Sequence, residues 1–241
     1  MKQAPGYGPQ PITLGNVQCI MEMQTFQRAL AYPAALDAEG NVILVEEAKK
    51  EAPYFCPLCR TPFIIREGTK RRKHFAHKRL PEKPCSVETV THLAAKNIIA
   101  RALRAAIREN RPYPIRWLCP ECGKEHVGNL ARPGRQVELE APIGKGARAD
   151  VLVKSKRGKP LVAIEVVVSH FPEPETLDFY RSQRITVVIV PVKPDSLADL
   201  FEGIHLTDPE YVYNAPCRQP LCPSCAERCR LCLRSPFRLR S

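Results

Sequence analysis

Two acidic residues interrupt apolar stretches that otherwise have the composition of buried β-strands. Asp150 lies in the sequence Arg-Ala-Asp-Val-Leu-Val, and Glu165 lies in Leu-Val-Ala-Ile-Glu-Val-Val-Val. A carboxylate buried in a sheet is unfavourable unless it is paired or binds a metal. If the two stretches form a hairpin through the turn at 155–159, both carboxylates can converge on one Mg²⁺, an ion that prefers oxygen ligands. The alternative is that each acid is exposed at a strand end or paired with a neighbouring Arg or Lys.

A predicted helix before these strands carries side chains that could reach the same site. Glu88, His92 and Lys96 recur every four residues, so they line one stripe of a helix expected over residues 87–110. The strand that precedes the two acidic strands adds Glu140 as a further candidate. The alternative for the helical stripe is a solvated ladder of charges.

A cluster of cysteine and histidine residues precedes the predicted helix. Cys56 and Cys59 have the spacing that lets one turn offer two thiolates to a tetrahedral ion. The preferred partners are His77 and Cys85, with His74 as the substitute histidine. We therefore expect a structural zinc site, because two thiolates beside a histidine favour a closed site over a catalytic one.

A second Cys-x-x-Cys pair, Cys119 and Cys122, needs two further ligands. The preferred partners are Cys222 and Cys225 of the C-terminal tail, and Cys229 and Cys232 form the remaining pair of candidate zinc ligands. A self-contained site within the tail and an iron–sulfur cluster are the alternatives. One to three structural zinc sites are expected in all. The tail cysteines are Cys217, Cys222, Cys225, Cys229 and Cys232.

The charge of the chain favours a polyanionic partner. The formal net charge is +12, from 37 Lys and Arg against 25 Asp and Glu, and such a field attracts phosphates. Nucleic acid, DNA in the first place, is the expected partner, with a merely soluble basic surface as the alternative. Few aromatic residues are interleaved with the basic ones, so a platform for stacking single-stranded bases is not indicated. The candidate phosphate-binding residues are Arg71, Arg72, Lys73, Arg148 and Lys154.

The N-terminal sequence is polar and rich in turn residues, unlike a secretion signal. No stretch reaches the roughly 20 apolar residues of a membrane helix. A cytoplasmic location is therefore expected, where paired cysteines bind metal rather than form disulfides. A protein partner is a further expectation, through the N-terminal arm or the C-terminal tail.

The elements that must position these residues follow the order helix, three strands, helix and strand. This order is typical of an α/β fold in which helices cover a mixed sheet. The predicted strands span 136–141, 147–154, 160–169 and 185–190, and the second helix spans 173–183. The predicted organisation is a flexible or docking arm at 1–25, a hairpin and zinc-binding module at 26–85, a core at 86–208 with a zinc knuckle inserted at 116–130, and a Cys- and Arg-rich zinc-binding tail at 209–241.

The pattern of motifs resembles the PD-(D/E)XK nuclease superfamily, and within it the branch of CoiA-like competence proteins. The resemblance rests on Arg-Ala-Asp-Val at 148–151, Ala-Ile-Glu at 163–165, Ser169, the Cys-Pro-x-Cys and His-Phe-Ala-His motifs, and the helix with Glu88. It covers about residues 28 to 191. It implies a restriction-endonuclease-like core in which Asp150 and Glu165 hold Mg²⁺, with Glu88 as a further ligand.

One residue departs from the superfamily pattern. Val167 stands two positions after Glu165, where the superfamily has Lys and the CoiA-like branch often has Gln. Valine neither donates nor accepts a hydrogen bond, so Lys96 and Lys154 are the candidates to supply the charge. The resemblance implies a Mg²⁺-dependent DNA nuclease acting in DNA processing, recombination, uptake or defence. The alternative, which Val167 favours, is a non-catalytic zinc-containing adaptor that binds nucleic acid through a degenerate nuclease fold.

Overall fold

The computed structural model of the protein describes residues 31–213, except residues 70, 84, 120–122, 133, 145 and 209–210. The predicted N-terminal arm and the tail from residue 214 onward lie outside the described residues. Within the described part, no helix has the length and apolar character needed to cross a membrane. The described elements are β1 (Ala34–Leu36), β2 (Val42–Leu44), β3 (Tyr54–Phe55), β4 (Pro62–Gly68), β5 (Arg71–His77), α2 (Val87–Arg108), β6 (Pro114–Leu118), β7 (Glu125–Asn129), β8 (Gln136–Gly144), β9 (Ala147–Lys154), β10 (Pro160–Val167), α3 (Pro174–Ser182), β11 (Thr186–Pro191), the 3-10 turns η1 (Pro194–Ser196) and η2 (Ala198–Phe201), β12 (Ile204–His205) and β13 (Val212–Tyr213).

The N-terminal sheet has five strands in the order β2-β1-β3-β4-β5. Its first two strands form the predicted hairpin, and Asp37 holds the turn because its Oδ1 accepts the Asn41 backbone N–H over 2.7 Å. Aromatic rings fill the core of this sheet, with Tyr32 stacked on Phe63 at a centroid distance of 5.0 Å. The strands are short, so these rings and the neighbouring cysteines make up much of the module's core.

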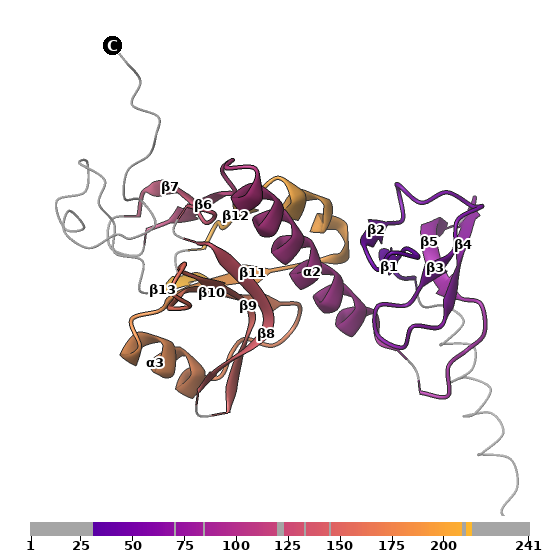
Figure 1. The fold of residues 1–241 in the computed structure, drawn as a ribbon. Helices are drawn as coiled ribbons and strands as arrows, with labels where there is room; N and C mark the ends of the chain where they lie inside the picture. The colour runs from indigo at the N-terminus through magenta and orange to yellow at the C-terminus, as the bar shows by residue number, and fades with distance from the viewer. Residues whose placement is uncertain are drawn as a thin grey trace, which may run out of the picture.

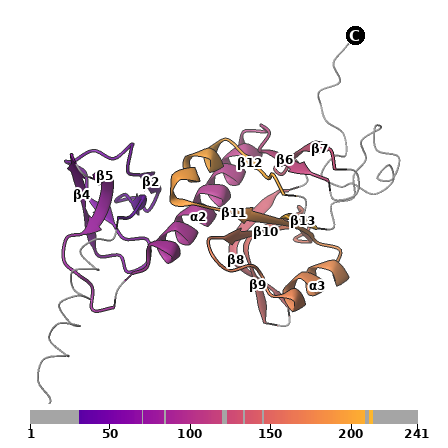
Figure 2. The same cartoon turned by 180° about the vertical axis from the view of Figure 1, so that it is seen from behind.

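Helix α2 connects the N-terminal sheet to the rest of the molecule (Figures 1 and 2). It begins as predicted at Ser86, whose Oγ accepts the Thr89 backbone N–H over 2.9 Å, and this N-cap satisfies an otherwise unpaired donor. Its apolar face contributes to one core cluster that contains Leu36 of β1, Ile98 of α2 and Ile164 of β10. The helix is therefore packed on two sheets at once.

The second sheet has five strands in the order β13-β11-β10-β9-β8. Strands β8, β9 and β10 are antiparallel, whereas β10 and β11 are parallel, so the sheet is mixed as predicted. Alternate residues of β10 enter opposite clusters: Ile164 and Val166 pack with α2, and Ala163 and Val167 pack with Tyr180 of α3. The predicted order of helix, three strands, helix and strand is present as α2, β8, β9, β10, α3 and β11.

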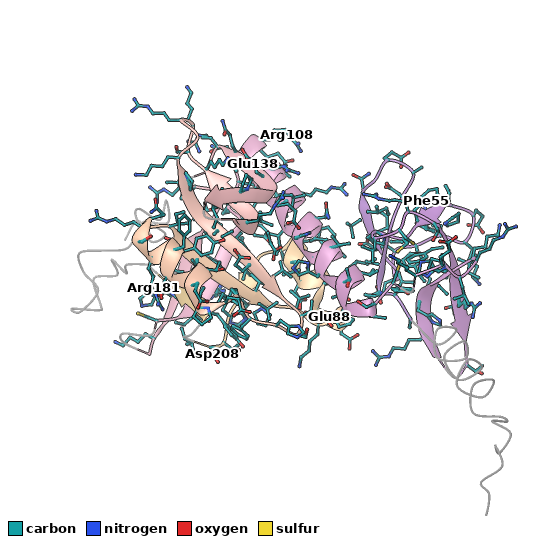
Figure 3. The ribbon with its side chains drawn as sticks, turned by 90° about the horizontal axis from the view of Figure 1, so that it is seen from below. Phe55, Glu88, Arg108, Glu138, Arg181 and Asp208 are labelled. Carbon is teal, nitrogen blue, oxygen red and sulfur yellow. The ribbon has the colours of Figure 1, made fainter. Side chains whose placement is uncertain are left out.

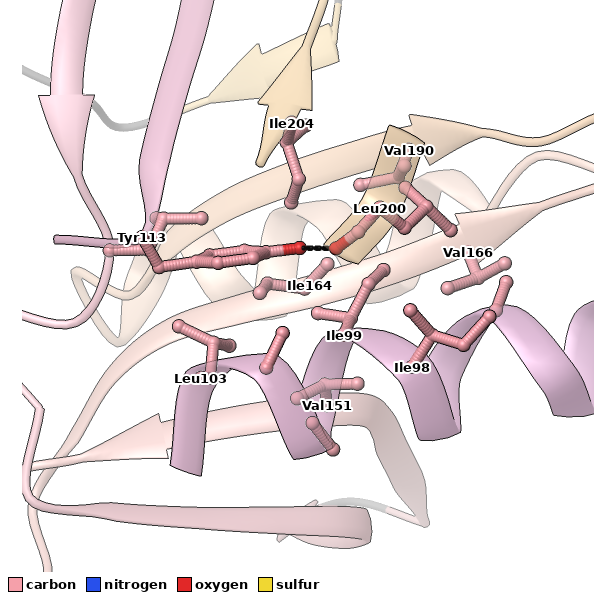
Figure 4. Close-up of a cluster of buried hydrophobic side chains, with 14 of the residues drawn as sticks. Ile98, Ile99, Leu103, Tyr113, Val151, Ile164, Val166, Val190, Leu200 and Ile204 are labelled. Carbon is pink, nitrogen blue, oxygen red and sulfur yellow. Dashed lines mark hydrogen bonds between the residues drawn. The ribbon is translucent and has the colours of Figure 1, made fainter. Parts of the chain in front are cut away.

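A third, three-stranded sheet lies at the C-terminal end of α2, in the order β12-β6-β7 (Figure 1). Tyr113 precedes this sheet and donates a hydrogen bond of 2.5 Å to the Leu200 carbonyl, within the main core (Figure 4). Strands β12 and β13 have two residues each, too few for any periodicity to reveal them in the sequence. Strand β13 extends the second sheet beyond residue 209, at which the sequence places the start of the tail.

Candidate functional site

Three cysteines and one histidine meet in the N-terminal module. Cys56 and Cys59 lie between β3 and β4, His77 ends β5, and Cys85 lies directly before α2. Their ligand atoms all lie within 4.8 Å of one another. The turn that presents the first two thiols is closed by the Arg60 N–H, which donates to the Cys56 carbonyl over 3.0 Å. These are the four residues that the sequence favours as a zinc site.

The electrostatics of this Cys3His cluster fit a metal cation. Burial and the neighbouring thiols raise the pKa of Cys85 to about 12, so a thiolate there needs a positive charge beside it. Burial opposes ionisation of Cys59 as well, but hydrogen bonds with Thr61 and with the neighbouring thiols of Cys85 and Cys56 together outweigh it and lower the pKa of Cys59. Burial lowers the pKa of His77, whose Nε2 lies 3.3 Å from the Cys59 sulfur. A neutral imidazole and three thiolates, formed as zinc displaces the thiol protons, are the ligands of a closed structural zinc site.

The second histidine of the module has another role. His74 Nδ1 donates to the Arg72 carbonyl over 2.8 Å, and the cluster contains His77 instead. Strand alternation separates the two, because residues three apart on β5 point to opposite faces of the sheet.

The second Cys-x-x-Cys pair is described only in part. Cys119 is buried directly after β6, and its N–H donates to the Lys124 carbonyl over 2.9 Å. Cys122 and all the tail cysteines lie outside the described residues, so a second zinc site and the iron–sulfur alternative stay predictions. His126 pairs with Trp117 and is only 1% exposed, on the hairpin face that also carries Cys119. The spacing Cys119-x2-Cys122-x3-His126 makes His126 a further candidate ligand that the sequence analysis did not name.

Three acidic residues form a row across neighbouring strands of the second sheet. Val151 of β9 is paired with Leu139 of β8 on one side and with Ile164 of β10 on the other. The neighbouring aligned positions, one residue after Leu139 and Ile164 and one residue before Val151, are Glu140, Glu165 and Asp150. The predicted hairpin is present as β9 and β10, and the convergence of Asp150 and Glu165 on one ion stays a prediction.

Asp150 lies at the centre of the row and is held by three groups. Its Oδ2 accepts the Val166 backbone N–H over 2.9 Å and lies 3.0 Å from His92 Nε2. Its Oδ1 lies 4.0 Å from the ammonium of Lys96. His92 and Lys96 are one turn apart on α2, so the helix contributes two cationic or hydrogen-bonding groups to one carboxylate.

Lys96 is 5% exposed, which is unusual for a lysine. It forms an ion pair with Glu140 as well as its contact with Asp150. Burial lowers the pKa of Lys96, and the charge of Asp150 opposes this shift. Glu140 itself has a backbone φ of 49° in the middle of β8, a left-handed conformation that costs energy and is concentrated at functional sites.

Glu165 completes the row and is 8% exposed. The Tyr180 hydroxyl donates a hydrogen bond to its Oε1. Burial raises the pKa of Glu165 to about 7, and the neighbouring charge of Asp150 contributes to the increase. Burial and the neighbouring carboxylate would make a positive charge favourable at this position.

The remaining predicted residues lie away from this row. Glu88 accepts a hydrogen bond from Ser169 and lies 3.5 Å from His170 Nδ1 rather than contacting Asp150. Lys154 pairs with Glu138 at 2.5 Å, and Figure 3 shows Glu138 toward the Arg108 end of α2, opposite the end that carries Glu88.

The predicted phosphate-binding residues are scattered in the structure. Arg148 donates to the Glu140 carbonyl through Nη2 at 2.8 Å, so it lies next to the acidic row. Lys73 donates to the Ala48 carbonyl over 2.8 Å, and Arg72 is exposed. The side chain of Arg71 lies outside the described residues.

Val167, two residues after Glu165, is buried in the cluster that contains Ala163, Tyr180 and Ile189. It is therefore a packing residue. The ammonium group near Asp150 comes from Lys96 of α2 instead.

Comparison with known proteins gives a match for the N-terminal module. Neither a curated protein nor a solved structure matches the chain significantly. Residues 41–88, about a fifth of the chain, match the family model described as competence protein CoiA, N-terminal domain. That range contains the whole Cys3His cluster and ends at Glu88, and in this segment the chain is similar to competence protein CoiA.

Proposed function

We propose that the chain is a Mg²⁺-dependent DNA nuclease of the PD-(D/E)XK superfamily, in the CoiA-like branch, with a zinc-stabilised N-terminal module. The match of residues 41–88 to the CoiA N-terminal domain supports a role in DNA uptake and competence. The observation that carries the catalytic part is the row Glu140, Asp150 and Glu165, with Lys96 of α2 buried against it.

Asp150 and Glu165 are the residues that would hold Mg²⁺. Their carboxylates come from adjacent strands, and the raised pKa of Glu165 means that added positive charge would be favourable at this position. When bound, Mg²⁺ supplies Lewis-acid stabilisation of a phosphodiester and lowers the pKa of a water ligand.

The other residues of the site position and neutralise charge. Lys96 offers an ammonium that is already desolvated, so it can contact a phosphate or the attacking water without losing a hydration shell. His92 and the Val166 N–H hold the Asp150 carboxylate in one orientation, and Tyr180 does the same for Glu165. In this proposal Lys96 takes the part that the superfamily gives to the lysine at the position of Val167.

The second candidate function is a zinc-containing adaptor that binds nucleic acid without cutting it. The burial of Val167 among apolar side chains supports it, because the family's lysine position has become part of the core. The buried Lys96 supports the nuclease, because an ammonium held beside two carboxylates is costly unless it serves the site.

Cleavage of plasmid and linear DNA by the purified full chain, with and without Mg²⁺, tests the choice. Asp150→Asn keeps the side-chain volume and an oxygen for the Val166 N–H, so the variant should fold. We expect Mg²⁺-dependent cleavage by the wild type and a loss of about 100-fold or more in the variant, the scale of removing a group that stabilises the transition state. Salt-sensitive DNA binding without cleavage by the wild type would select the adaptor. Equal cleavage by Asp150→Asn with an unchanged melting curve would refute the assignment of the site.

A further inference from the structure

An exposed aromatic side chain lies in the loop that leaves β10. Phe171 is 52% exposed and is the most exposed of the large hydrophobic side chains in the described part of the chain. It stacks on Tyr211 with ring centroids 5.8 Å apart and planes inclined by 30°. Tyr211 in turn packs against two buried clusters. The pair is therefore a solvent-facing ring supported by a ring that is anchored in the core.

The sheet register places Tyr211 at the same level along the strands as the acidic row. Glu165 is paired with Ile189 of the parallel strand β11. On the other side of β11, Val188 is paired with Val212 of β13, and Tyr211 comes one residue earlier. Tyr211 therefore lies level with Glu165, two strands away across the sheet.

The loop of Phe171 is also tied to the helix that serves the row. Ser169, two residues before Phe171, donates a hydrogen bond to Glu88 of α2. Glu88 lies one helical turn before His92, whose Nε2 contacts Asp150. The loop between β10 and α3 thus runs from the acidic row to the exposed ring.

A lysine and a histidine lie in or near the loop that carries the ring. Val192, directly after β11, donates its N–H to the Val167 carbonyl over 2.8 Å, so the exposed Lys193 lies next to the start of the Phe171 loop. His170 exposes 89% of its side chain in the same loop. The loop thus carries an exposed ring and an exposed histidine and begins near a lysine, so it offers a stacking face and polar groups that can contact a phosphate.

We propose that Phe171, backed by Tyr211, stacks a nucleobase of single-stranded or frayed DNA and so places the neighbouring phosphodiester at the acidic row. A paired base inside a duplex already has both faces covered by its neighbours, so only an unpaired base can use the ring. The sequence does not indicate a stacking platform here, because the two rings are 40 positions apart in the sequence. The inference rests on the proposed nuclease function and specifies its substrate class.

Fluorescence anisotropy with the full chain tests the inference, using a labelled single-stranded oligonucleotide and the matching duplex without Mg²⁺. Stacking of one base on an aromatic ring corresponds to about 5- to 150-fold in affinity. We expect Phe171→Ala to weaken single-strand binding by a factor in this range and duplex binding by less than about twofold. Phe171→Trp should retain single-strand binding. Leu80→Ala, at an equally exposed side chain of the N-terminal module (47%), should change neither.

Two outcomes would overturn the inference. One is that Phe171→Ala binds the single strand as tightly as the wild type. This result counts against the inference even if the variant's melting temperature changes, because the ring would then be covered by another part of the chain or by a protein. The other is an equal loss of single-strand and duplex binding. Both outcomes differ from a failure of the proposed function. In that case Phe171 would contribute to single-strand binding, but neither the wild type nor any variant would cleave DNA with Mg²⁺.

Discussion

Replacing Lys96 with methionine tests whether the Lys96 ammonium acts in catalysis or only stabilises the fold. The methionine side chain would keep the apolar stem and remove only the charge, which leaves Glu140 and Asp150 without their cation. Removing one partner of a buried ion pair costs about 3–5 kcal/mol. Because Glu140 is 45% exposed and water can solvate it, we expect the lower end of that range, about 3 kcal/mol of unfolding free energy.

The effect of Lys96→Met on cleavage should exceed its effect on folding. Loss of one preorganised charge at a transition state costs about 10²–10³ in rate. The ammonium also favours the ionised form of Glu165, so its removal should raise the pKa of Glu165 above its value of about 7. The rise in cleavage rate with pH should then move to higher pH.

The assay is single-turnover DNA cleavage with saturating Mg²⁺. The rates are measured between about pH 6 and 9, a window around the pKa of Glu165, at a temperature at which circular dichroism shows that the variant is folded. Lys50→Met is the control, because Lys50 forms an exposed ion pair with Glu67 in the N-terminal module. Cleavage by Lys96→Met at the wild-type rate, with an unshifted pH profile, would refute the role assigned to Lys96.

The remaining predictions concern the zinc cluster and the neighbours of the acidic row. Cys85→Ser, or a strong chelator, should release zinc and lower the melting temperature, since structural zinc contributes about 10–16 kcal/mol of apparent binding energy in small domains; zinc analysis and thermal melting check this. Burial raises the pKa of Glu165 to about 7 from an ordinary value of 4.5. The protonated Glu165 therefore contributes stability that is fully present below pH 4.5 and is lost as the pH rises through 7. Thermal melts without divalent ions should show this loss in the wild type and not in Glu165→Gln. Tyr180→Phe removes the donor that favours the Glu165 carboxylate, so the pH profile of cleavage should move to higher pH with little change in fold. Glu140→Gln should slow cleavage, whereas Glu138→Gln, on the same strand but paired away from the row, should not.

The elements and the first metal cluster could be predicted because their signals are local. A capped apolar helix, β-branched strands and a Cys-x-x-Cys turn each follow from neighbouring residues. The choice of Cys56, Cys59, His77 and Cys85 needed only the spacing and the preference for a closed ligand set. The sequence could not choose between Lys96 and Lys154, since both were reasonable sources of charge. The choice depends on packing: α2 lies over the row, whereas Lys154 pairs with Glu138.

Features that depend on long-range register could be predicted only as candidates, as Glu140 was, or not at all. The level of Glu140 in the row follows from the pairing of β8 with β9, and a one-residue slip would have placed it on the other face. The stacking of Phe171 on Tyr211 requires β13, a two-residue strand that no periodic pattern reveals. Such contacts are set by the tertiary arrangement of the strands rather than by local sequence.

The central claim is that Asp150 and Glu165 share one divalent cation. A crystal structure of the full chain grown with Mn²⁺, with anomalous scattering to locate the metal, tests it most directly. We predict an ion within about 2.0–2.3 Å of one oxygen from each carboxylate, absent from the same position in Asp150→Asn. Carboxylates that face opposite sides of the sheet, or a Mn²⁺ ion bound elsewhere while this position stays empty, would contradict the account.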